Sequence, residues 1–466
     1  MANARAAQPA WAALSFRDRA RALRTLALRL RRDEELPRLI SSEAGKPLFE
    51  AVGFEVAYVL EAIRFLSGRA GRAALAETSR RPFVFPWKRA RVAWRPRGVV
   101  AVIGPWNFPL LNNFGDAVAP LLAGNAVVLK PSPHTPGVSS RVAQLWHEAG
   151  LPDGIFQVVE GGTDVGRTLV DLCDMVFFTG SGAGGRAVAR QAAERMIPYV
   201  AELGGKSAFV VLADADLPAA ARAAAWGAFA NSGQICIRPE RVLVQASVGD
   251  AFVALLIREV QALRVGPVDG DVDVGAVMLD AQVDRAKAQI ADAVERGGRI
   301  LCGGELLAHP GRYFAPTLVD QVAPESALAR EETFAPVLPI LRVADADEAV
   351  RLANDSPLGL AGYVWSGDPQ IARQVARRLQ VGSVCINDVL VNYLCANAPL
   401  GGIKQSGLGF RHGPESLRQF CYPQSIVEDR AWHGWLASII RRQFGFPYQP
   451  KKLRLVRWLN RVLRPW

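Results

Sequence analysis

Three residues that lie far apart in the chain have the chemical types needed for covalent chemistry on a carbonyl group. The first, Cys236, stands in the segment Asn231-Ser-Gly-Gln-Ile-Cys236-Ile. Gly233 in this segment indicates a backbone that turns or approaches another segment closely. A thiolate is a nucleophile, whereas a buried cysteine is more commonly a small apolar side chain. The residues that accompany Cys236 favour the chemical interpretation.

A carboxyl and an amide accompany the thiol. Glu202 is followed by Leu203, two glycines and Lys206 at the end of an apolar stretch. A carboxyl in such a place resists ionisation and could act as a general base, although a Glu that caps the following turn would look the same. Asn107 lies in Gly104-Pro-Trp-Asn107-Phe-Pro, directly after an apolar run. Its amide N–H₂ could stabilise an oxyanion from a rigid loop.

The elements that must position these residues form two series of short apolar runs and helices. Short continuous runs are typical of strands in a parallel sheet that is covered on both faces. The first series contains Val99–Ile103, Ala126–Leu129, Ile155–Val159, Met175–Phe178 and Ala208–Leu212. The second series contains strands at Val242–Val244, Arg299–Leu301, Gly362–Trp365 and Ser383–Ile386, and helices at Asp250–Leu263, Gln282–Glu295 and Pro369–Leu379. The expected fold class is therefore α/β, with two doubly wound domains.

Two further segments complete the expected architecture. Leucines recur at helical spacing between Ser15 and Leu66, and Gly45-Lys46-Pro47 interrupts them, which predicts amphipathic helices. Arg81 to Arg97 alternates aromatic and basic residues between prolines, which predicts a small extended β-hairpin arm.

Composition excludes several classes of protein. The 466 residues include six cysteines without a CxxC pair and only five histidines, so we expect no metal site and no disulfide framework. Neither a secretory signal nor a run of about 18 apolar residues is evident, so the cytoplasm is the expected compartment. Eight of the eleven net positive charges lie in residues 431–466, which contain no Asp or Glu. The nearly balanced remainder argues against nucleic-acid binding.

The basic tail at residues 431–466 has an amphipathic end. Five apolar residues fall on one helical face, largely opposite the arginines: Leu455, Val456, Leu459, Val462 and Leu463. Trp458 and Trp466 add aromatic rings. Such a helix could make peripheral contact with an anionic membrane, or dock on the enzyme body or a second subunit.

The three chemical clusters resemble, in order and approximate spacing, the signatures of the aldehyde dehydrogenase superfamily. Four other family blocks are also present: Lys130-Pro-Ser, Phe178-Thr-Gly-Ser-Gly-Ala-Gly-Gly185, Glu331-Glu-Thr-Phe-Ala-Pro336 and Pro399-Leu-Gly-Gly-Ile-Lys-Gln-Ser-Gly407. One such block is a weak signal, but seven in order are specific. The resemblance extends from about Ser15 to Ile426.

The resemblance implies NAD(P)-dependent, non-acylating oxidation of an aldehyde to a carboxylic acid. Cys236 would form a thiohemiacetal and then a thioester, Asn107 and the Cys236 N–H would hold the alkoxide, and Glu202 would activate the hydrolytic water. The residues implied to bind the cofactor are Trp106, Lys130, Gly180, Ser181, Gly185, Gly204, Glu332 and Phe334. The family often has Glu three residues after the lysine, but this chain has Pro133 there, so both NAD and NADP are open.

The expected domains follow from these blocks. Residues 1–80 and 98–205 would form a Rossmann-like NAD(P)-binding domain, and 206–405 the catalytic domain. Residues 81–97 and 406–430 resemble the family's oligomerisation arm, which implies a homodimer or homotetramer, and 431–466 form the basic tail.

The substrate has two candidate classes. Phe108, Leu111, Ile235, Ile237 and Trp106 would surround or lead to the thiol, which favours an apolar or aromatic aldehyde. Arg238 and Asn392 could instead read a carboxylate, as in succinate semialdehyde. An acylating, coenzyme A-dependent dehydrogenase is an alternative that Glu202 argues against, and a non-catalytic, membrane-associated scaffold is another. No histidine stands in a motif that suggests a thiol hydrolase.

Overall fold

The structure is a computed structural model that describes residues 1–82, 88–429, 438–439, 442–443 and 445–462. The described chain divides into two compact units, which are treated separately below. The first unit comprises residues 1–74 and 96–420, and it contains both α/β domains. The second comprises residues 75–95 and 421–466.

The first unit begins with the expected amphipathic helices. Leu23, Leu26 and Leu30 share the buried face of one helix, and Gly45 ends the next helix in the left-handed conformation. The helices are α1 Ala2–Ala13, α2 Phe16–Arg32, α3 Glu35–Ala44, α4 Leu48–Glu50, a π-helical segment Ala51–Val56, α5 Ala57–Leu66 and α6 Arg69–Ala74.

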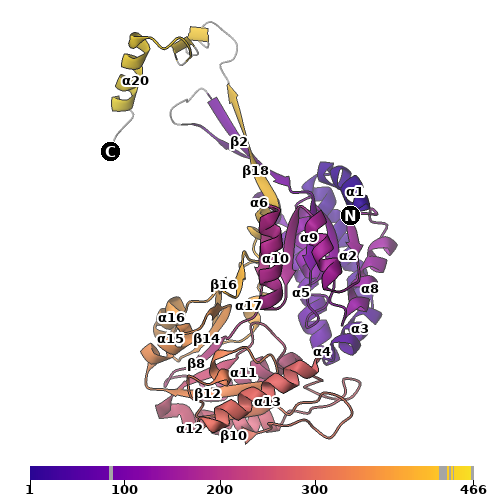
Figure 1. Cartoon of the computed structure of the whole chain (residues 1–466), viewed down its shortest axis with the longest axis vertical. Helices are drawn as coiled ribbons and strands as arrows, with labels where there is room; N and C mark the ends of the chain where they lie inside the picture. The colour runs from indigo at the N-terminus through magenta and orange to yellow at the C-terminus, as the bar shows by residue number, and fades with distance from the viewer. Residues whose placement is uncertain (83–87, 430–437, 440–441, 444, 463–466) are drawn as a thin grey trace. The chain divides into compact units, whose positions relative to one another are not determined.

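A six-stranded sheet forms the first domain, in the order β17-β7-β6-β3-β4-β5. Its strands are β3 Val99–Ile103, β4 Ala126–Lys130, β5 Phe156–Val158, β6 Met175–Thr179, β7 Tyr199–Glu202 and β17 Gly407–Leu408. All pairs are parallel except β17 with β7. The helices between these strands are α7 Phe114–Leu122, α8 Pro136–Glu148, α9 Thr163–Leu172 and α10 Gly182–Glu194. In Figure 1, α9 and α10 lie in front of this sheet.

A seven-stranded sheet forms the second domain, in the order β10-β11-β12-β9-β8-β14-β15. Its strands are β8 Ala208–Val211, β9 Arg241–Gln245, β10 Arg299–Cys302, β11 Thr317–Asp320, β12 Val337–Val343, β14 Ala361–Trp365 and β15 Ser383–Ile386. Only β10 runs antiparallel to its neighbour. Apolar side chains of these strands and of the covering helices form a continuous core. The two doubly wound α/β domains that the sequence predicts are therefore present.

The remaining elements of the second half are mostly helical. They are α11 Leu217–Phe229, a 3-10 turn Ala230–Gly233, α12 Ala246–Gln261, α13 Asp280–Glu295, α14 Ala327–Arg330, α15 Ala346–Asn354, α16 Pro369–Arg378, α17 Val391–Leu394 and α18 Ser416–Gln419. A short antiparallel pair joins β13 Leu358–Gly359 to β16 Ile403–Lys404.

The sequence patterns missed the two-residue strands β13, β16 and β17 and three longer strands, and they grouped one strand with the wrong series. The longer missed strands are β7, β11 and β12. Pro339 lies in β12, and a proline in an apolar run argues against a central strand, yet β12 lies between β11 and β9. The run at Ala208–Leu212 was grouped with the first series, but β8 pairs with β9 and β14 of the second sheet. Order along the chain does not specify which sheet a strand joins.

The second unit contains a three-stranded sheet in the order β1-β2-β18, with strands β1 Thr78–Arg80, β2 Lys88–Pro96 and β18 Cys421–Asp429. The antiparallel pair of β1 with β2 agrees with an extended hairpin, but β1 lies outside the expected range 81–97, in residues that were assigned to the cofactor domain. The second segment of the expected arm begins at Cys421 rather than at residue 406, because β17 pairs with β7 and α18 packs on α6 and α7 in the first unit. A helix of the tail follows, α20 Pro450–Val462, and Trp466 and Leu463 lie outside the described residues.

Among the helices that the structure describes, none has the length and apolar character to span a bilayer. The described residues also contain no group of three or more His, Cys, Asp or Glu side chains that could hold a metal ion.

Candidate active site

The first domain contributes loops from the carboxyl ends of three neighbouring parallel strands. Asn107 follows β3, Gly180 follows β6, and Glu202 ends β7. Strands β7, β6 and β3 are adjacent in the sheet, so their ends meet at one edge, where ligands bind in open α/β sheets. Cys236 comes from the second domain, after the turn that follows α11. Asn107, Glu202 and Cys236 line one cleft, which also includes Thr179, Gly180 and Ser181 and has about 750 Å³ of empty space.

The turn before Cys236 has an unusual backbone. Asn231, Ser232 and Gly233 have φ angles of 49°, 56° and 70°, so three consecutive residues are left-handed. A Cβ atom on Gly233 would lie 2.5 Å from the Ala335 carbonyl oxygen, which confirms the predicted close approach. Left-handed non-glycine residues are strained and persist where their surroundings hold them. Here the Asn231 N–H donates to the buried Glu50 carboxylate at 3.0 Å.

A buried lysine holds the loop that contains Asn107. Lys46 Nζ donates to the Asn107 carbonyl at 2.7 Å and pairs with Glu55 Oε1 at 2.7 Å, and neither charged side chain is exposed. The other Glu55 oxygen accepts the N–H groups of Leu110 and Leu111. The sequence patterns used Lys46 only as part of a helix break, because a lysine offers no sign that it will be buried.

Hydrogen bonds also join Asn107 directly to the cysteine turn. Asn107 Nδ2 donates to the Gln234 carbonyl at 2.8 Å, and Asn231 Nδ2 donates to the Asn107 carbonyl at 3.0 Å. The Asn107 amide has two N–H donors, so this bond uses one and orients the other. The two domains thus position the amide and the thiol through shared contacts.

Burial dominates the acid–base properties of the site. Glu202 is 4% exposed, and its Oε1 atom has no hydrogen-bond partner. Burial raises the pKa of Glu202 to about 8; the positive charge of Arg411 opposes this increase and the negative charge of Asp116 adds to it. Burial likewise raises the pKa of the Cys236 thiol to about 12, again opposed by Arg411. A carboxyl that remains partly protonated at neutral pH is suited to proton transfer.

The two glycines after Glu202 allow two close approaches. A Cβ atom on Gly204 would lie 2.3 Å from a Glu332 carboxylate oxygen, and one on Gly205 would lie 2.6 Å from the Cys236 carbonyl oxygen. The Gly205 N–H also donates to Glu332 Oε1 at 3.0 Å. This explains why a carboxylate precedes two glycines: the segment packs against both the cysteine backbone and Glu332.

A buried ionic cluster holds the Glu332 segment. Glu240 pairs with Lys206 at 2.7 Å and with Arg238 at 2.6 Å, and it accepts the N–H groups of Thr333 and Phe334. Arg238 is fully buried and also donates to backbone carbonyls. The hypothesis that Arg238 binds a substrate carboxylate is therefore wrong, because its guanidinium is fully buried and paired with Glu240.

The residues implied to bind the cofactor lie in and beside the same cleft. Trp106, Gly180, Ser181, Gly204, Glu332 and Phe334 line it, and the Trp106 and Phe334 rings pack edge to face at 5.7 Å. Ser181 caps α10 and accepts the Gly184 N–H at 3.2 Å, and Gly185 packs closely on Leu203. Lys130 ends β4 and donates to the Pro131 and Gly161 carbonyls. Burial lowers the pKa of Lys130.

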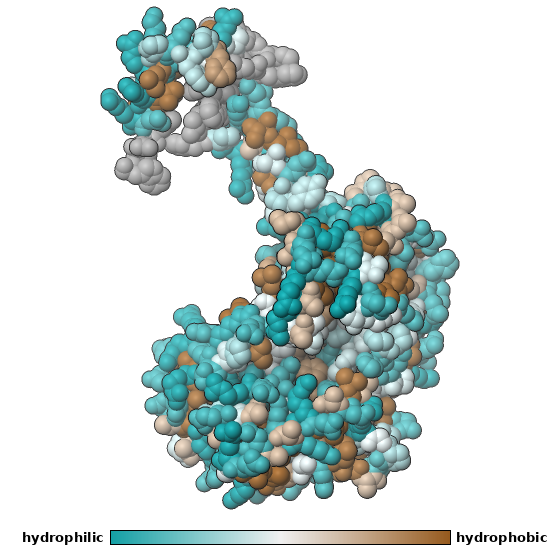
Figure 2. All heavy atoms as spheres, viewed as in Figure 1, coloured by the Kyte–Doolittle hydropathy of each residue, from teal (hydrophilic) through white to brown (hydrophobic). Residues whose placement is uncertain are grey.

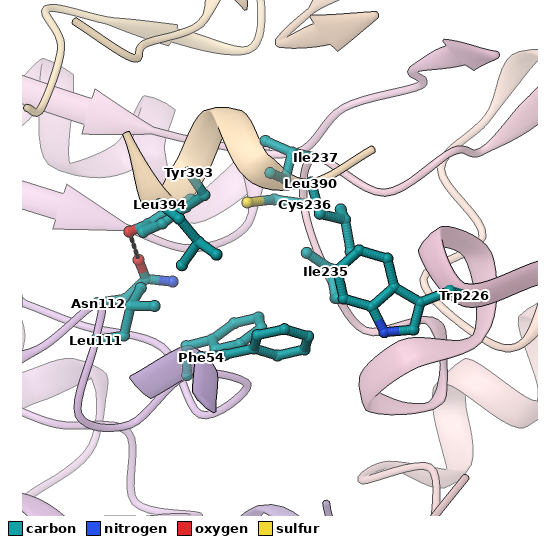
Figure 3. Close-up of a pocket in the computed structure, with 11 residues that line it drawn as sticks. Phe54, Leu111, Asn112, Trp226, Ile235, Cys236, Ile237, Leu390, Tyr393 and Leu394 are labelled. Atoms are coloured by element: carbon teal, nitrogen blue, oxygen red, sulfur yellow. Dashed lines mark hydrogen bonds between the residues drawn. The ribbon is translucent and has the colours of Figure 1, made fainter. Parts of the chain in front are cut away.

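A second pocket, with about 450 Å³ of empty space, opens on the other side of Cys236 and is almost wholly apolar. It is lined by Phe54, Phe108, Leu111, Asn112, Trp226, Ile235, Cys236, Ile237, Leu390, Tyr393 and Leu394. Figure 3 shows these side chains facing one space, with the Tyr393 hydroxyl bonded to Asn112 at 2.7 Å. Four apolar residues predicted to surround the thiol, Phe108, Leu111, Ile235 and Ile237, are all present.

Trp106 does not line this pocket, but it lines the cleft of Glu202 and Glu332, called the polar cleft below. That cleft also reaches Cys236, which agrees with the prediction that Trp106 leads to the thiol. The prediction for Asn392 needs correction. Asn392 does not line the pocket, and its amide donates to Ser383 Oγ at 3.1 Å. Tyr393 and Leu394 of α17 line the pocket instead. Phe54 and Trp226 come from helices whose sequence gave no sign of proximity to Cys236.

A third buried ionic group lies beside Glu202 and was not predicted. Arg411 donates to Thr179 Oγ1 at 2.9 Å, pairs with Asp116 Oδ2 at 3.5 Å, and contacts Asn112 and Tyr393. Burial raises the pKa of Asp116 to about 7, although Arg411 lowers it. Arg411 thus links the floor of the polar cleft to the wall of the apolar pocket.

Comparisons with known proteins agree with this architecture. A model of the aldehyde dehydrogenase family matches residues 1–426. The chain is 40% identical to 4,4'-diapolycopene aldehyde oxidase of a Methylomonas species, over 96% of this chain and 85% of the relative. It is 36% identical to a Mycobacterium bovis protein named as a candidate succinate-semialdehyde dehydrogenase [NADP(+)] 2, over 99% and 89% of the two chains.

Solved structures give the same result. The crystal structure of an NAD-dependent aldehyde dehydrogenase from Sinorhizobium meliloti superposes with a TM-score of 0.89 at 36% identity, covering 93% of this chain and 86% of that one. The chain therefore belongs to the aldehyde dehydrogenase family, as the resemblance of its motifs indicates, and it has that family's fold.

Proposed function

We propose that this protein oxidises an apolar aldehyde to a carboxylic acid with NAD or NADP, through a covalent thioester on Cys236. The observation that carries this proposal is the position of Cys236, which lines both the apolar pocket and the polar cleft. An aldehyde chain in the first and a nicotinamide in the second would meet at the sulfur.

In the first half-reaction, Cys236 Sγ attacks the aldehyde carbon and a C–S bond forms. The thiol proton must leave, because burial keeps the pKa of Cys236 high, and the Glu202 carboxylate in the same cleft can accept it. The second Asn107 N–H and the Cys236 N–H stabilise the alkoxide of the thiohemiacetal. A bound NAD(P) supplies the acceptor for the hydride that the carbon releases, which leaves the thioester.

Before the second half-reaction, Glu202 releases the thiol proton to solvent, and its carboxylate then takes a proton from water, which it later returns to the departing thiolate. The hydroxyl oxygen adds to the thioester carbon, the C–S bond breaks, and the acid and the free thiol are released. The unpartnered Oε1 atom of Glu202 supports this role, since a buried carboxyl oxygen without a partner can accept a hydrogen bond from a water molecule.

The residues of the polar cleft fit a dinucleotide. Glu332 would bind the nicotinamide ribose hydroxyls, Phe334 and Trp106 would pack near the nicotinamide, and Gly204 leaves space beside them. Gly180, Ser181 and Gly185 would face the pyrophosphate at the N-terminus of α10, and Lys130 the adenosine ribose. Exposed Pro133 offers no carboxylate that would repel a 2′-phosphate, so both dinucleotides suit this chain.

The substrate class follows from the apolar pocket. Its lining, among the residues that the structure describes, includes no Lys, Arg or His. A carboxylate at the far end of succinate semialdehyde would lose its hydration there without gaining an ion pair, which is costly. An apolar chain would instead gain about 25 cal/mol for each Å² of apolar surface removed from water.

The proposal is tested by NAD(P)H absorbance with a long alkanal, benzaldehyde and succinate semialdehyde, with each dinucleotide, and with and without coenzyme A. We expect turnover of the apolar aldehydes without coenzyme A and none in Cys236→Ala. Turnover that requires coenzyme A would support the acylating alternative, and no turnover of any aldehyde would support the scaffold. Assembly into a homodimer or homotetramer and a cytoplasmic location remain predictions, and light scattering tests the first.

A further inference from the structure

The helix α20 has a basic face and an apolar face. Arg454, Arg457 and Arg461 recur at helical spacing along one side of the helix, whereas Leu455 and Leu459 lie on the other side with Val462. Figure 2 shows brown apolar residues beside teal polar ones in this segment. No residue of α20 is buried, and Trp458 and Val462 are each 58% exposed.

The composition of this region indicates an interfacial helix rather than a core helix. In the apolar stripe, Val462 is exposed, whereas Leu455 and Leu459 are half-buried. Apolar surface that is left even partly exposed costs free energy unless something covers it. Phe446 and Tyr448, just before the helix, are 83% and 77% exposed, and their rings pack together at 4.6 Å. Aromatic rings beside arginines and leucines are typical of segments that lie in the plane of a membrane interface.

Charge decides which surface α20 fits. Residues 431–466 carry eight basic side chains and no acidic one, and they hold eight of the eleven net charges of the chain. A second copy of the helix would bring arginines towards arginines, and the rest of the chain is close to neutral. A bilayer that contains anionic lipids offers both negative charge and an apolar layer beneath it.

We infer that α20 binds the surface of an anionic membrane, with Leu455, Leu459 and Val462 inserted below the headgroups and the arginines among them. This goes beyond the proposed reaction and does not depend on it. Membrane binding would concentrate the protein where apolar aldehydes partition, which agrees with the apolar pocket beside Cys236.

Cosedimentation of the full-length protein with vesicles tests this inference. Vesicles of equal parts phosphatidylcholine and phosphatidylglycerol are compared with vesicles of phosphatidylcholine alone. We expect binding to the anionic vesicles only, with affinity that falls as salt is added. Replacing Arg457 by Gln should weaken binding about fivefold, the effect of one basic residue near an anionic surface.

A matched pair of variants separates insertion from simple charge attraction. Leu455→Gln with Leu459→Gln keeps the net charge and should reduce binding to anionic vesicles by about tenfold or more, because buried apolar carbon is lost. Asn460→Gln lies outside the apolar stripe and should bind like the natural protein. Turnover of a short, water-soluble aldehyde should be unchanged in both, so a failure of this inference is distinct from a failure of the proposed reaction.

Three outcomes would overturn the inference. The first is no binding of the natural protein to anionic vesicles, and the second is equal binding to neutral and anionic vesicles. The third is a smaller particle mass of the leucine variant by light scattering with unchanged vesicle binding, which would assign the apolar stripe of α20 to a second copy of the chain.

Discussion

The two cavities that meet at Cys236 are built in opposite ways. The apolar pocket is lined by aromatic and aliphatic side chains from several helices and loops, with Asn112 and the Tyr393 hydroxyl as its few polar groups. The polar cleft adds the carboxyls of Glu202 and Glu332, glycines and backbone groups at the ends of parallel strands to apolar side chains such as Trp106 and Phe334. Under the proposed function, this difference means that the apolar pocket would select the substrate by desolvation, whereas the polar cleft would control the charges of the reaction. The following changes test that division, from the largest expected effect to the smallest.

Cys236 lines both cavities, so its replacement should stop the proposed reaction with any aldehyde and either dinucleotide. We expect Cys236→Ala to lower NAD(P)H formation by roughly 10³-fold or more, because no second cysteine lines either cavity among the residues that the structure describes. The measurement is the steady-state rate with a long alkanal. Fluorescence titration with NAD(P)H should give a nearly unchanged dissociation constant. Substantial residual turnover would mean that another residue is the nucleophile.

Glu202 belongs only to the polar cleft. Glu202→Gln keeps the shape of the side chain but removes the base, so we expect steady-state turnover to fall by about 10²- to 10⁴-fold. Because hydrolysis of the thioester should be slowed, intact-mass measurement after mixing with aldehyde and dinucleotide should detect the acyl group on the protein. Turnover equal to that of the natural protein would place the base elsewhere.

Lys46 lines neither cavity, but it binds Glu55 and the Asn107 carbonyl of the loop whose residues line both. Lys46→Met should lower the free energy of unfolding by about 3–5 kcal/mol, because it leaves the Glu55 carboxylate buried without its ion pair. Urea denaturation measures this change. Adding Glu55→Gln to Lys46→Met should recover part of the loss, and an unchanged midpoint would show that the pair contributes little.

Leu394 belongs only to the apolar pocket and is 38% exposed, so a charged residue can be placed there. We expect Leu394→Arg to reduce kcat/KM for a long alkanal by about tenfold, and to increase kcat/KM for succinate semialdehyde. Leu408→Arg, at a position 60% exposed in β17, is the matched control. If both variants behave alike, the apolar pocket does not bind the substrate chain.

Asp116 does not line the polar cleft, but its charge affects the pKa of Glu202 within it. Glu202 acts only in its carboxylate form, so the rate should rise as pH increases through about 8, where the pKa of Glu202 lies. The negative charge of Asp116 raises this pKa, so Asp116→Asn should move the acid limb of the pH–rate profile to lower pH. The gain in rate at pH 7 should be less than about tenfold. A profile that does not move would separate Asp116 from the catalytic base.

Local patterns predicted most of the fold because local physics decides it. The buried runs that became β3, β4, β6 and β14 are continuous and apolar, and the leucines of α2 share one face. The same patterns could not predict β12, since the proline within it is disfavoured in a central strand. They also could not assign β8 to its sheet, because pairing depends on residues far along the chain.

The candidate site divides in the same way. Cys236, Glu202 and Asn107 were identifiable because their residue types suit the chemistry and their motifs are unusual. The pair of glycines at 204 and 205 was recognisable in the sequence as unusual. Its cause, the close approach of the Glu332 carboxylate and the Cys236 carbonyl, is seen only in the tertiary structure. Arg238 was misassigned because its sequence neighbours place it beside the thiol, whereas its side chain turns inward to Glu240.

The amino-acid sequence by itself determined the family, the two α/β domains, the candidate reactive residues and the basic tail, since each depends on residue type and near-neighbour spacing. Only the tertiary structure decided which cavity each side chain lines, which charges are buried together, and how far the pKa values of Glu202 and Asp116 rise. Those properties depend on desolvation and on contacts between segments separated by many residues. Neither can be predicted from residue types and short-range spacing.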